Sequence, residues 1–228
     1  MKRLSLRRFV PSAVAVHEAV TKFGGQPSWL GPPAWPLSAS SGEPLRFICQ
    51  IELRAELFGD GPARMAYLFL NQPPRDAIEE GAFDPDVMEA DGGENAVILQ
   101  PSGAACLVET RPLPSGPSLY DQAGEPCEHL CELEAAVDPP YLSREQWQKL
   151  TKAEGARYIE KLEGTKLGGT PDFELEEAGF PRGKWQLALQ LDQYRRPGDP
   201  LYLNLGSTLA RGFLLLSADR TEGRFVAL

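Results

Sequence analysis

The chain has 228 residues, a formal net charge of −9, 42% apolar residues and 24% charged residues. This composition is typical of a folded globular protein, and no stretch approaches the roughly 18 consecutive apolar residues of a membrane helix. A net-acidic chain is a poor candidate for holding nucleic-acid phosphates. We therefore expect neither a membrane nor a nucleic acid as partner.

The N-terminus begins with basic side chains and then turns apolar, as a signal peptide does. Pro11 breaks the apolar run, and His17 and Glu18 end it. We therefore expect a strand with a basic lead. Four cysteines are too few for a disulfide framework in a chain of this length, and cytoplasmic is the simplest expected location.

A short motif, Thr-Lys-apolar-Gly-Gly-x-Pro, occurs at residues 21–27 and again at 165–171. Paired glycines permit positive φ or a close backbone approach, and the proline fixes its own φ near −65°. An aromatic residue, Trp29 or Phe173, then anchors the turn in the core. A structural role is favoured, and the alternative is that one or both turns line a binding cleft. The candidate binding residues in the turns are Gly24, Gly25, Pro27, Trp29, Gly168, Gly169, Pro171 and Asp172.

An amphipathic strand follows each motif, at residues 45–53 and 185–193. Apolar side chains alternate with polar ones, which is typical of a half-buried strand. Runs that are apolar on both faces come next, at 65–71 and 211–217, and predict covered strands. The residues expected to share one face are Leu45, Phe47, Cys49, Ile51 and Leu53 in the first strand, and Trp185, Leu187, Leu189 and Leu191 in the second.

The polar faces of the two amphipathic strands also match. Gln50 precedes Glu52 by two residues, and Gln190 precedes Asp192 in the same way. If a twofold axis relates the copies, these four side chains could converge on one binding cleft. Equally, they could cap hydrogen bonds of the sheet or face water.

The acidity of the chain is concentrated in its middle. Residues 61–142 hold 15 acidic and three basic side chains, a net charge of −12. Such a segment favours a basic protein partner, although a solvated acidic surface is the simpler interpretation. Within it, residues 95–101 and 104–110 predict a hairpin.

One helix is expected after the acidic segment, over residues 143–164. Ser143 and Gln146 form the pattern of a capping box, and Gly164 can end the helix.

These elements predict a β-rich α+β fold in which two pseudo-symmetric halves, each a Gly-Gly-x-Pro turn with its strands, pack into one domain over residues 1–228. The halves would be 21–71 and 165–228, an internal duplication. An acidic insertion at 72–142 and a connecting helix at 143–164 would lie between them.

We find no catalytic signature, and we expect no metal and no cofactor. Cys127, His129 and Cys131 lie within five residues, but a structural zinc needs four ligands, usually in two separated pairs. His17 and His129 are the only histidines, and no G-x-S-x-G motif is present. The many paired carboxylates mostly lie in polar loops.

The segments "TKFGGQPSWL", "PLRFICQIEL", "TKLGGTPDF" and "LALQLDQ" resemble the bacterial YwqG-like family. They are also similar to a domain of eukaryotic programmed-cell-death-2 and ribosome-biogenesis proteins. The resemblance runs from about Thr21 to the C-terminus. It implies a protein-binding domain, because the eukaryotic relatives act as chaperones for a ribosomal protein, and relatives encoded near toxins suggest immunity. The zinc module of some relatives is not carried over, because this chain lacks its paired Cys-x-x-Cys units.

We therefore expect a non-enzymatic, intracellular, chaperone-like or immunity-type protein that recognises a basic protein partner. The alternative is a small-molecule-binding protein or an enzyme that uses the symmetric Gln and acid cleft.

Overall fold

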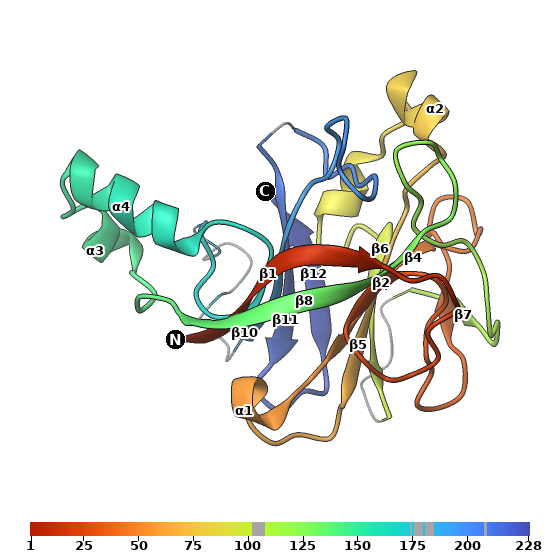
Figure 1. Ribbon diagram of the computed structural model, residues 1–228, viewed down its shortest axis with the longest axis horizontal. Helices are drawn as coiled ribbons and strands as arrows, with labels where there is room; N and C mark the ends of the chain where they lie inside the picture. Colours follow the sequence, from red (N-terminus) through yellow and green to blue (C-terminus); the bar gives the residue numbers. More distant parts are fainter. Residues whose placement is uncertain (102–107, 174, 176–179, 181–184, 208) are drawn as a thin grey trace.

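One antiparallel sheet organises the computed structural model, which describes residues 1–101, 108–173, 175, 180, 185–207 and 209–228 (Figure 1). Within this part of the chain, ten strands follow the order β12-β11-β10-β9-β1-β8-β2-β4-β5-β6. A separate two-stranded ribbon pairs β3 with β7. The strands are β1 (Lys2–Pro11), β2 (Lys22–Gly24), β3 (Trp35–Pro36), β4 (Arg46–Glu52), β5 (Met65–Leu70), β6 (Asn95–Gln100), β7 (Thr110–Arg111), β8 (Glu128–Val137), β9 (Lys166–Gly168), β10 (Trp185–Asp192), β11 (Arg211–Ser217) and β12 (Gly223–Ala227).

The sheet nearly closes on itself. Its two terminal strands, β6 and β12, contact each other, and a Cβ built on Gly223 would lie 2.4 Å from a methyl group of Val97. The interior is filled from both ends of the sheet, by side chains such as Ile51 and Leu68 on one side and Leu189 and Leu214 on the other. Two smaller apolar clusters lie outside the sheet, over β4–β6 and over β10–β12.

The expected single apolar face of the two amphipathic strands is wrong, because each strand contains an irregularity. The register of β4 against β5 shifts between Phe47 and Cys49, and that of β10 against β11 shifts between Leu187 and Leu189. A bulge adds one residue, so the side chains beyond it point to the opposite face. Phe47 and Leu187 therefore pack outside the sheet, whereas Cys49 and Leu189 pack inside.

The strands that were expected to be covered on both faces, β5 and β11, are buried throughout their apolar runs. In β5, Tyr67 and Phe69 pack on the outer cluster, and Ala66 and Leu68 pack on the inner one. The expected N-terminal strand is present as β1.

The acidic segment 72–142 is more than an insertion, because it supplies two strands of the sheet. β6 pairs with β5, and β8 lies in the centre between β1 and β2. The second strand of the hairpin expected here falls largely at 102–107, outside the described residues.

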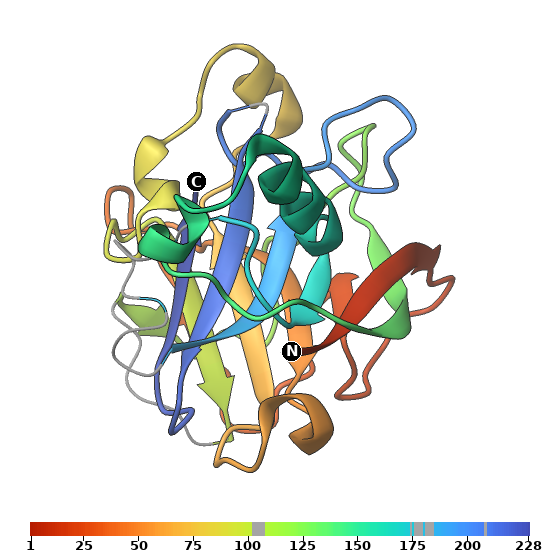
Figure 2. The ribbon, with the colours of Figure 1, turned by 90° about the vertical axis from the view of Figure 1, so that its left-hand side faces the viewer.

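The helix expected over 143–164 is two helices, α3 (Arg144–Trp147) and α4 (Lys152–Leu162), which face the viewer in Figure 2. The capping box at Ser143 is confirmed, and a second one, in which Thr151 caps α4 with Glu154, starts a new helix after a break. The described residues also form the short helices α1 (Ala55–Phe58) and α2 (Arg75–Glu79) and the 3₁₀ helix η1 (Pro85–Met88).

Candidate functional site

The two Gly-Gly-x-Pro turns follow β2 and β9, on opposite sides of the central pair β1 and β8. All four glycines have positive φ, at +71° and +65° for Gly24 and Gly25 and at +67° and +83° for Gly168 and Gly169. A Cβ on Gly24 would lie 2.0 Å from the backbone oxygen of Cys127. All four glycines therefore serve the expected left-handed conformation, and Gly24 also permits the expected close backbone approach.

The lysine of each motif is fully buried. Lys22 Nζ donates to Glu128 Oε1 at 2.6 Å and to the Val16 carbonyl at 2.5 Å. Lys166 Nζ donates to Asp138 Oδ2 at 2.9 Å and to the carbonyls of Leu162 and Thr170, both at 2.7 Å. Sequence analysis did not single out these lysines. A lysine stands at the same position of both motifs, and this repetition is the sequence signal from which their role could have been predicted.

Gln50 and Gln190 lie behind the turns, and their amides are fully engaged with the backbone. Gln50 Oε1 accepts from Ser28 N at 2.8 Å, and its Nε2 donates to the carbonyls of Val20 and Glu18. Gln190 Oε1 accepts from Asp172 N at 3.1 Å, and its Nε2 donates to two carbonyls, those of residues 162 and 164. Both side chains are buried. Of the two roles expected for these glutamines, a binding cleft or the capping of backbone hydrogen bonds, the structure shows the second.

Glu52 and Asp192 do not share a cleft with each other. β4 and β10 are separated by four strands of the sheet. Glu52 contacts Arg54 at 2.8 Å, and Asp192 contacts Arg211 at 2.8 Å. Burial raises the pKa of Asp192 above its ordinary value.

The remaining predicted residues of the turns are mainly packed. Pro27 and Pro171 are buried, and Trp29 stacks on Phe69 with ring centroids 6.1 Å apart. Phe173 is 38% exposed, so it anchors its turn less completely than expected. Asp172 has a fully buried side chain and is paired with Arg211.

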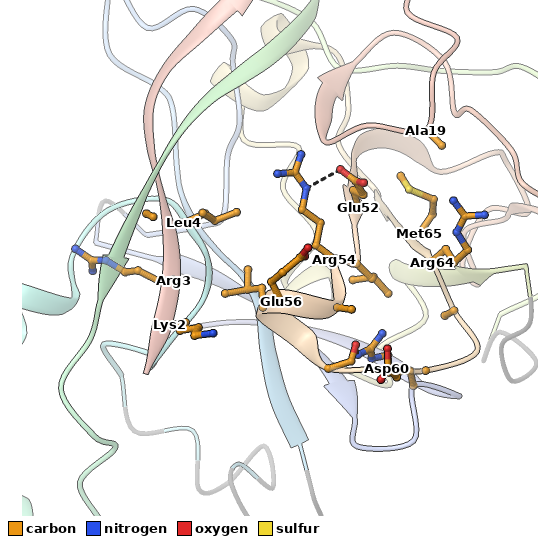
Figure 3. A pocket seen from close by; sticks show the side chains of 18 of the residues that line it. Lys2, Arg3, Leu4, Ala19, Glu52, Arg54, Glu56, Asp60, Arg64 and Met65 are labelled. Atoms are coloured by element: carbon orange, nitrogen blue, oxygen red, sulfur yellow. Dashed lines mark hydrogen bonds and ion pairs between the residues drawn. The ribbon is translucent and has the colours of Figure 1, made fainter.

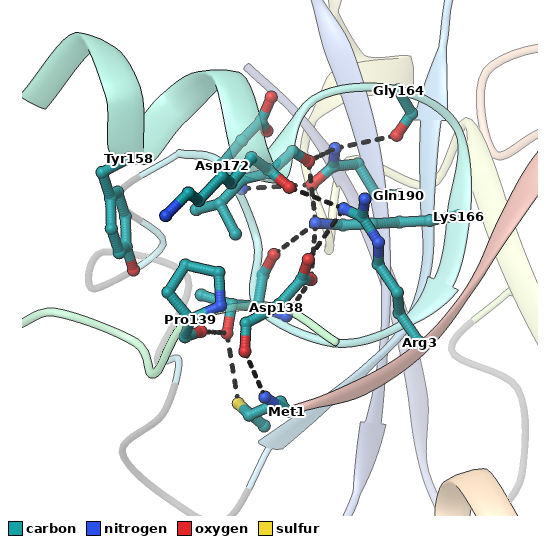
Figure 4. Close-up of polar contacts among 12 residues, drawn as sticks. Met1, Arg3, Asp138, Pro139, Tyr158, Gly164, Lys166, Asp172 and Gln190 are labelled. Atoms are coloured by element: carbon teal, nitrogen blue, oxygen red, sulfur yellow. Dashed lines mark hydrogen bonds and ion pairs between the residues drawn. The ribbon is translucent and has the colours of Figure 1, made fainter. Parts of the chain in front are cut away.

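Charged side chains around the second turn form a buried cluster (Figure 4). Arg3 Nη1 approaches Asp138 Oδ1 at 2.7 Å, while the other oxygen of this carboxylate accepts from Lys166. Burial lowers the pKa of Lys166 to about 8, and the hydrogen bond that Lys166 donates to Asp138 opposes that shift. The cluster ties β1, the end of β8 and β9 together.

The cysteine and histidine group lies on or beside β8. Burial raises the pKa of Cys127 and of Cys131 to about 12 and lowers that of His129. Thiols with raised pKa are poor nucleophiles. In the described part of the chain, no three His, Cys, Asp or Glu side chains are grouped so that they could hold a metal ion. Cys106 lies outside the described residues, and His17 is exposed.

A cavity of about 990 Å³ opens between the start of β1, the end of β8 and the α1 loop (Figure 3). Of the predicted site residues, Glu52 alone is among the residues that line it. Its apolar floor includes Leu4, Leu53 and Leu57. Lys2, Arg64, Glu56 and Asp60 surround this floor.

A second feature is the acidic stretch around α2 and η1, which we call the acidic excursion (residues 76–91). It holds seven acidic and no basic side chains. The exposed ones are Asp76, Glu80, Asp86, Glu89 and Asp91.

No family model, no curated protein and no solved structure matches the chain. Among the helices that the structure describes, none combines the length and apolar character needed to cross a membrane.

We predict that Gly24→Ala destabilises the protein far more than Gly42→Ala does. Both glycines have φ of +71°, but a Cβ on Gly42 meets nothing within 4 Å. Gly42→Ala therefore costs about 1 kcal/mol for the left-handed conformation, and Gly24→Ala costs about 1–3 kcal/mol more for the clash. Urea titrations of both variants measure the difference, and equal losses would contradict the close approach.

We predict that Gln190→Ala lowers the free energy of unfolding by about 3 kcal/mol, because one backbone donor and two carbonyls lose their partner in a buried site. Gln148→Ala, at an exposed position, is the control and should change stability by about 0.5 kcal/mol or less. Chemical denaturation measures both. A loss for Gln190→Ala as small as the control's would return this glutamine to the ligand-binding interpretation.

We predict a loss of stability above pH 9 that is smaller in Cys131→Val. The folded pKa of this thiol is raised to about 12 from 9, so between these values the unfolded chain loses a proton that the folded chain keeps. Stability present below pH 9 then falls by up to about 1.4 kcal/mol per pH unit for this group. Urea titrations from pH 8 to 11 under reducing conditions measure the slope, and identical slopes for the two proteins would refute the assignment.

Proposed function

We propose that this protein is non-enzymatic and binds a basic protein partner through the acidic excursion. The single observation that carries the proposal is seven carboxylates with no basic residue among them, five of them exposed. In both views α2 stands away from the sheet (Figures 1 and 2). A partner can therefore reach this surface without disturbing the fold.

The physical basis is electrostatic complementarity. Carboxylates held close together make the local electrostatic potential more negative. This speeds the encounter with a basic protein surface and disfavours binding of an acidic surface. Asp84 and Asp76 also hold the local backbone, because their carboxylates accept from Asp86 N and Ala77 N, respectively. The charges are therefore presented on a defined backbone.

A non-catalytic role is supported by where the perturbed groups lie. Lys166, whose pKa is lowered, is buried in an ion pair with Asp138, and Asp192 and Cys131, whose pKa values are raised, are partly buried, Asp192 in an ion pair with Arg211 and Cys131 against the core. Shifted groups that gather in an accessible cleft are the usual mark of an active site. Here burial and structural pairing account for the shifts.

We also propose that the chain arose by duplication of a half that contains a Gly-Gly-x-Pro turn and its strands. Support comes from contacts that recur in both halves. Lys22 is the register partner of Gln50, and Lys166 that of Gln190. The residue two positions after each glutamine donates its backbone N–H to the motif threonine, at 3.0 Å in both cases.

Membership of the YwqG-like family belongs to the same proposal, and it rests on the motifs named above. Under it, the protein is chaperone-like or immunity-type, intracellular, and shields a basic partner. A toxin-like reading frame beside the gene would favour the immunity form, and its absence would favour a housekeeping chaperone.

We predict that replacing Glu80, Asp86, Glu89 and Asp91 together by lysine abolishes partner capture and leaves the fold intact, because all four side chains are exposed. Affinity purification of the tagged protein from its host at low and then moderate salt, with mass spectrometry, should yield a stoichiometric basic protein that dissociates as salt rises. Circular dichroism and Tm check the fold.

The control changes the net charge equally at exposed acids elsewhere, with lysine at Glu43, Glu109, Glu145 and Glu160. It should retain the partner. Loss of the partner in both variants would show that only total charge matters, and retention in both would exclude the acidic excursion as the binding surface.

A further inference from the structure

The cavity of about 990 Å³ lies where the sheet is incomplete, and we call it the lateral cavity (Figure 3). β2 pairs with β8 only as far as Leu130, and beyond this residue no strand of the described residues pairs with β8 on that side. The cavity reaches β8 at residues 135–137, and the start of β1, the end of β4 and α1 with its following loop bound it elsewhere. Its volume is at the upper end of the roughly 300–1,000 Å³ that is typical of small-molecule sites.

The wall of the lateral cavity is continuous with the interior core. Leu53 and Ala63 belong to the interior cluster, and Leu4 packs against it. Val137, at the edge of the cavity, is 78% exposed, although strand alternation places it on the same face of β8 as Leu133, which also packs on this cluster. Apolar surface is therefore accessible here, and an apolar molecule that covers it removes this surface from water, which is favourable.

Basic side chains outnumber acidic ones in the lining of the lateral cavity. The five basic and three acidic side chains are Lys2, Arg3, Arg54, Arg64, Arg220, Glu52, Glu56 and Asp60. Some of these charges are already matched, because Arg3 is paired with Asp138 outside the cavity and Glu52 is paired with Arg54. The remaining charges decide which kind of ligand the cavity favours.

Two basic side chains then remain against one carboxylate. Asp60 lies near Arg220, because its charge opposes the effect of burial, which lowers the pKa of that guanidinium. In the described part of the chain, neither Lys2 nor Arg64 has a carboxylate within ion-pair distance, and both residues are exposed. Glu56 is the remaining acid. The rim of the cavity therefore has a surplus of positive charge, which favours an anion over a cation.

Arg54 is the side chain placed to contact an anion directly. Its Nε donates to Glu52 Oε2 at 2.8 Å, and no other acceptor among the described residues binds this guanidinium. The side chain is half exposed, so Nη1 and Nη2 can donate to a ligand, in a planar arrangement that suits the oxygens of an anionic group. Figure 3 shows Arg54 between Lys2 on one side and Arg64 on the other.

We infer that the lateral cavity binds a small amphiphilic anion, a free molecule with an apolar body and one oxyanion group. The apolar body covers the surface around Leu4 and Leu53, and Arg54 donates to the oxyanion. Lys2 and Arg64 add positive potential at the rim, and Glu52 competes with the ligand for Arg54.

This site is distinct from both the sequence-predicted cleft and the proposed partner surface. Of the glutamines and acids expected to form a cleft, Glu52 alone lines the lateral cavity. In Figure 1, α1, which borders the cavity, and α2, in the acidic excursion, lie at opposite ends of the molecule. The inference therefore goes beyond the proposed function and stands or falls independently of it.

The test uses the full chain and two fluorescent probes. Anilinonaphthalene sulfonate has an apolar ring system and one sulfonate, and N-phenylnaphthylamine is the same ring system without the sulfonate. One sulfonate probe should bind per chain, at least fivefold more tightly than the neutral probe, and added salt should weaken only the sulfonate. No binding, or neutral-probe binding that is as tight as that of the sulfonate, overturns the inference.

Two substitutions should change the affinity for the sulfonate in opposite directions. Arg54→Gln removes the donor and should weaken the sulfonate at least fivefold, whereas Glu52→Gln removes the competing carboxylate and should tighten it. Neither should change Tm or the neutral probe appreciably, because this ion pair is partly exposed and therefore weak. An unchanged affinity for the sulfonate in Arg54→Gln overturns the inference.

The control for the loss of one positive charge is Arg157→Gln, at an exposed position on α4. It should bind both probes as the unaltered protein does. A loss of sulfonate affinity in Arg157→Gln equal to that in Arg54→Gln would show that only the net charge matters, and it would also overturn the inference.

A pair of valine substitutions locates the site. Val137 lines the cavity, whereas Val14 lies outside it and is almost equally exposed, at 76%. Val137→Trp fills the edge of the cavity and should weaken both probes at least tenfold with Tm unchanged, while Val14→Trp should not. Full binding in Val137→Trp overturns the inference.

Vesicles distinguish a free ligand from a membrane surface. The protein should not co-sediment with phosphatidylglycerol vesicles under conditions in which the sulfonate probe binds. Co-sedimentation that Val137→Trp abolishes would assign the cavity to an anionic lipid surface and overturn the inference of a free ligand.

Discussion

The burial of a lysine ammonium on each side of the central strand pair is the constraint on which the rest of the structure depends. An isolated buried charge is very costly, and it is tolerated only when a carboxylate and further hydrogen-bond acceptors surround it. Glu128 meets this need for Lys22, and Asp138 meets it for Lys166. Because these carboxylates lie at the two ends of β8, both lysines fix this strand in the middle of the sheet.

The glycine turns follow from the same requirement. Lys166 reaches the carbonyl of Thr170, four residues later, and this is possible because the chain turns back at Gly168 and Gly169 with positive φ. The glutamines then satisfy the backbone groups that the turns leave exposed in a buried place, as Gln190 does for Asp172 N. The glycines and glutamines that were candidates for a binding cleft therefore stabilise the turns of the fold.

The short length of β2 leaves part of β8 with a neighbouring strand on one side only among the described residues. Three residues are enough to hold Lys22 and Phe23, but the strands on either side are longer, and beyond Leu130 no strand of the described residues pairs with β8 on this side. The 990 Å³ cavity lies beside this end of β8, whereas the exposed carboxylates gather at the acidic excursion.

Much of this could be foreseen from the sequence, where local chemistry decides. The positive φ of the paired glycines, the covered strands β5 and β11, and the cap at Ser143 each depend on residues within a few positions. The bulges that turn Phe47 and Leu187 outward could not be foreseen, because a register shift is set by the neighbouring strand. The central position of β8 in the sheet could not be predicted either. Its alternating acidic residues are equally typical of a solvated segment, and only the neighbouring strands place it in the centre. The sequence by itself determined the repeated turn, the β-rich character and the acidity of the middle segment, because these are properties of composition and short-range pattern. The tertiary structure alone decided that the glutamines are buried, that Glu52 and Asp192 lie apart, and that one side of β8 is open, because each depends on contacts between residues far apart in the chain.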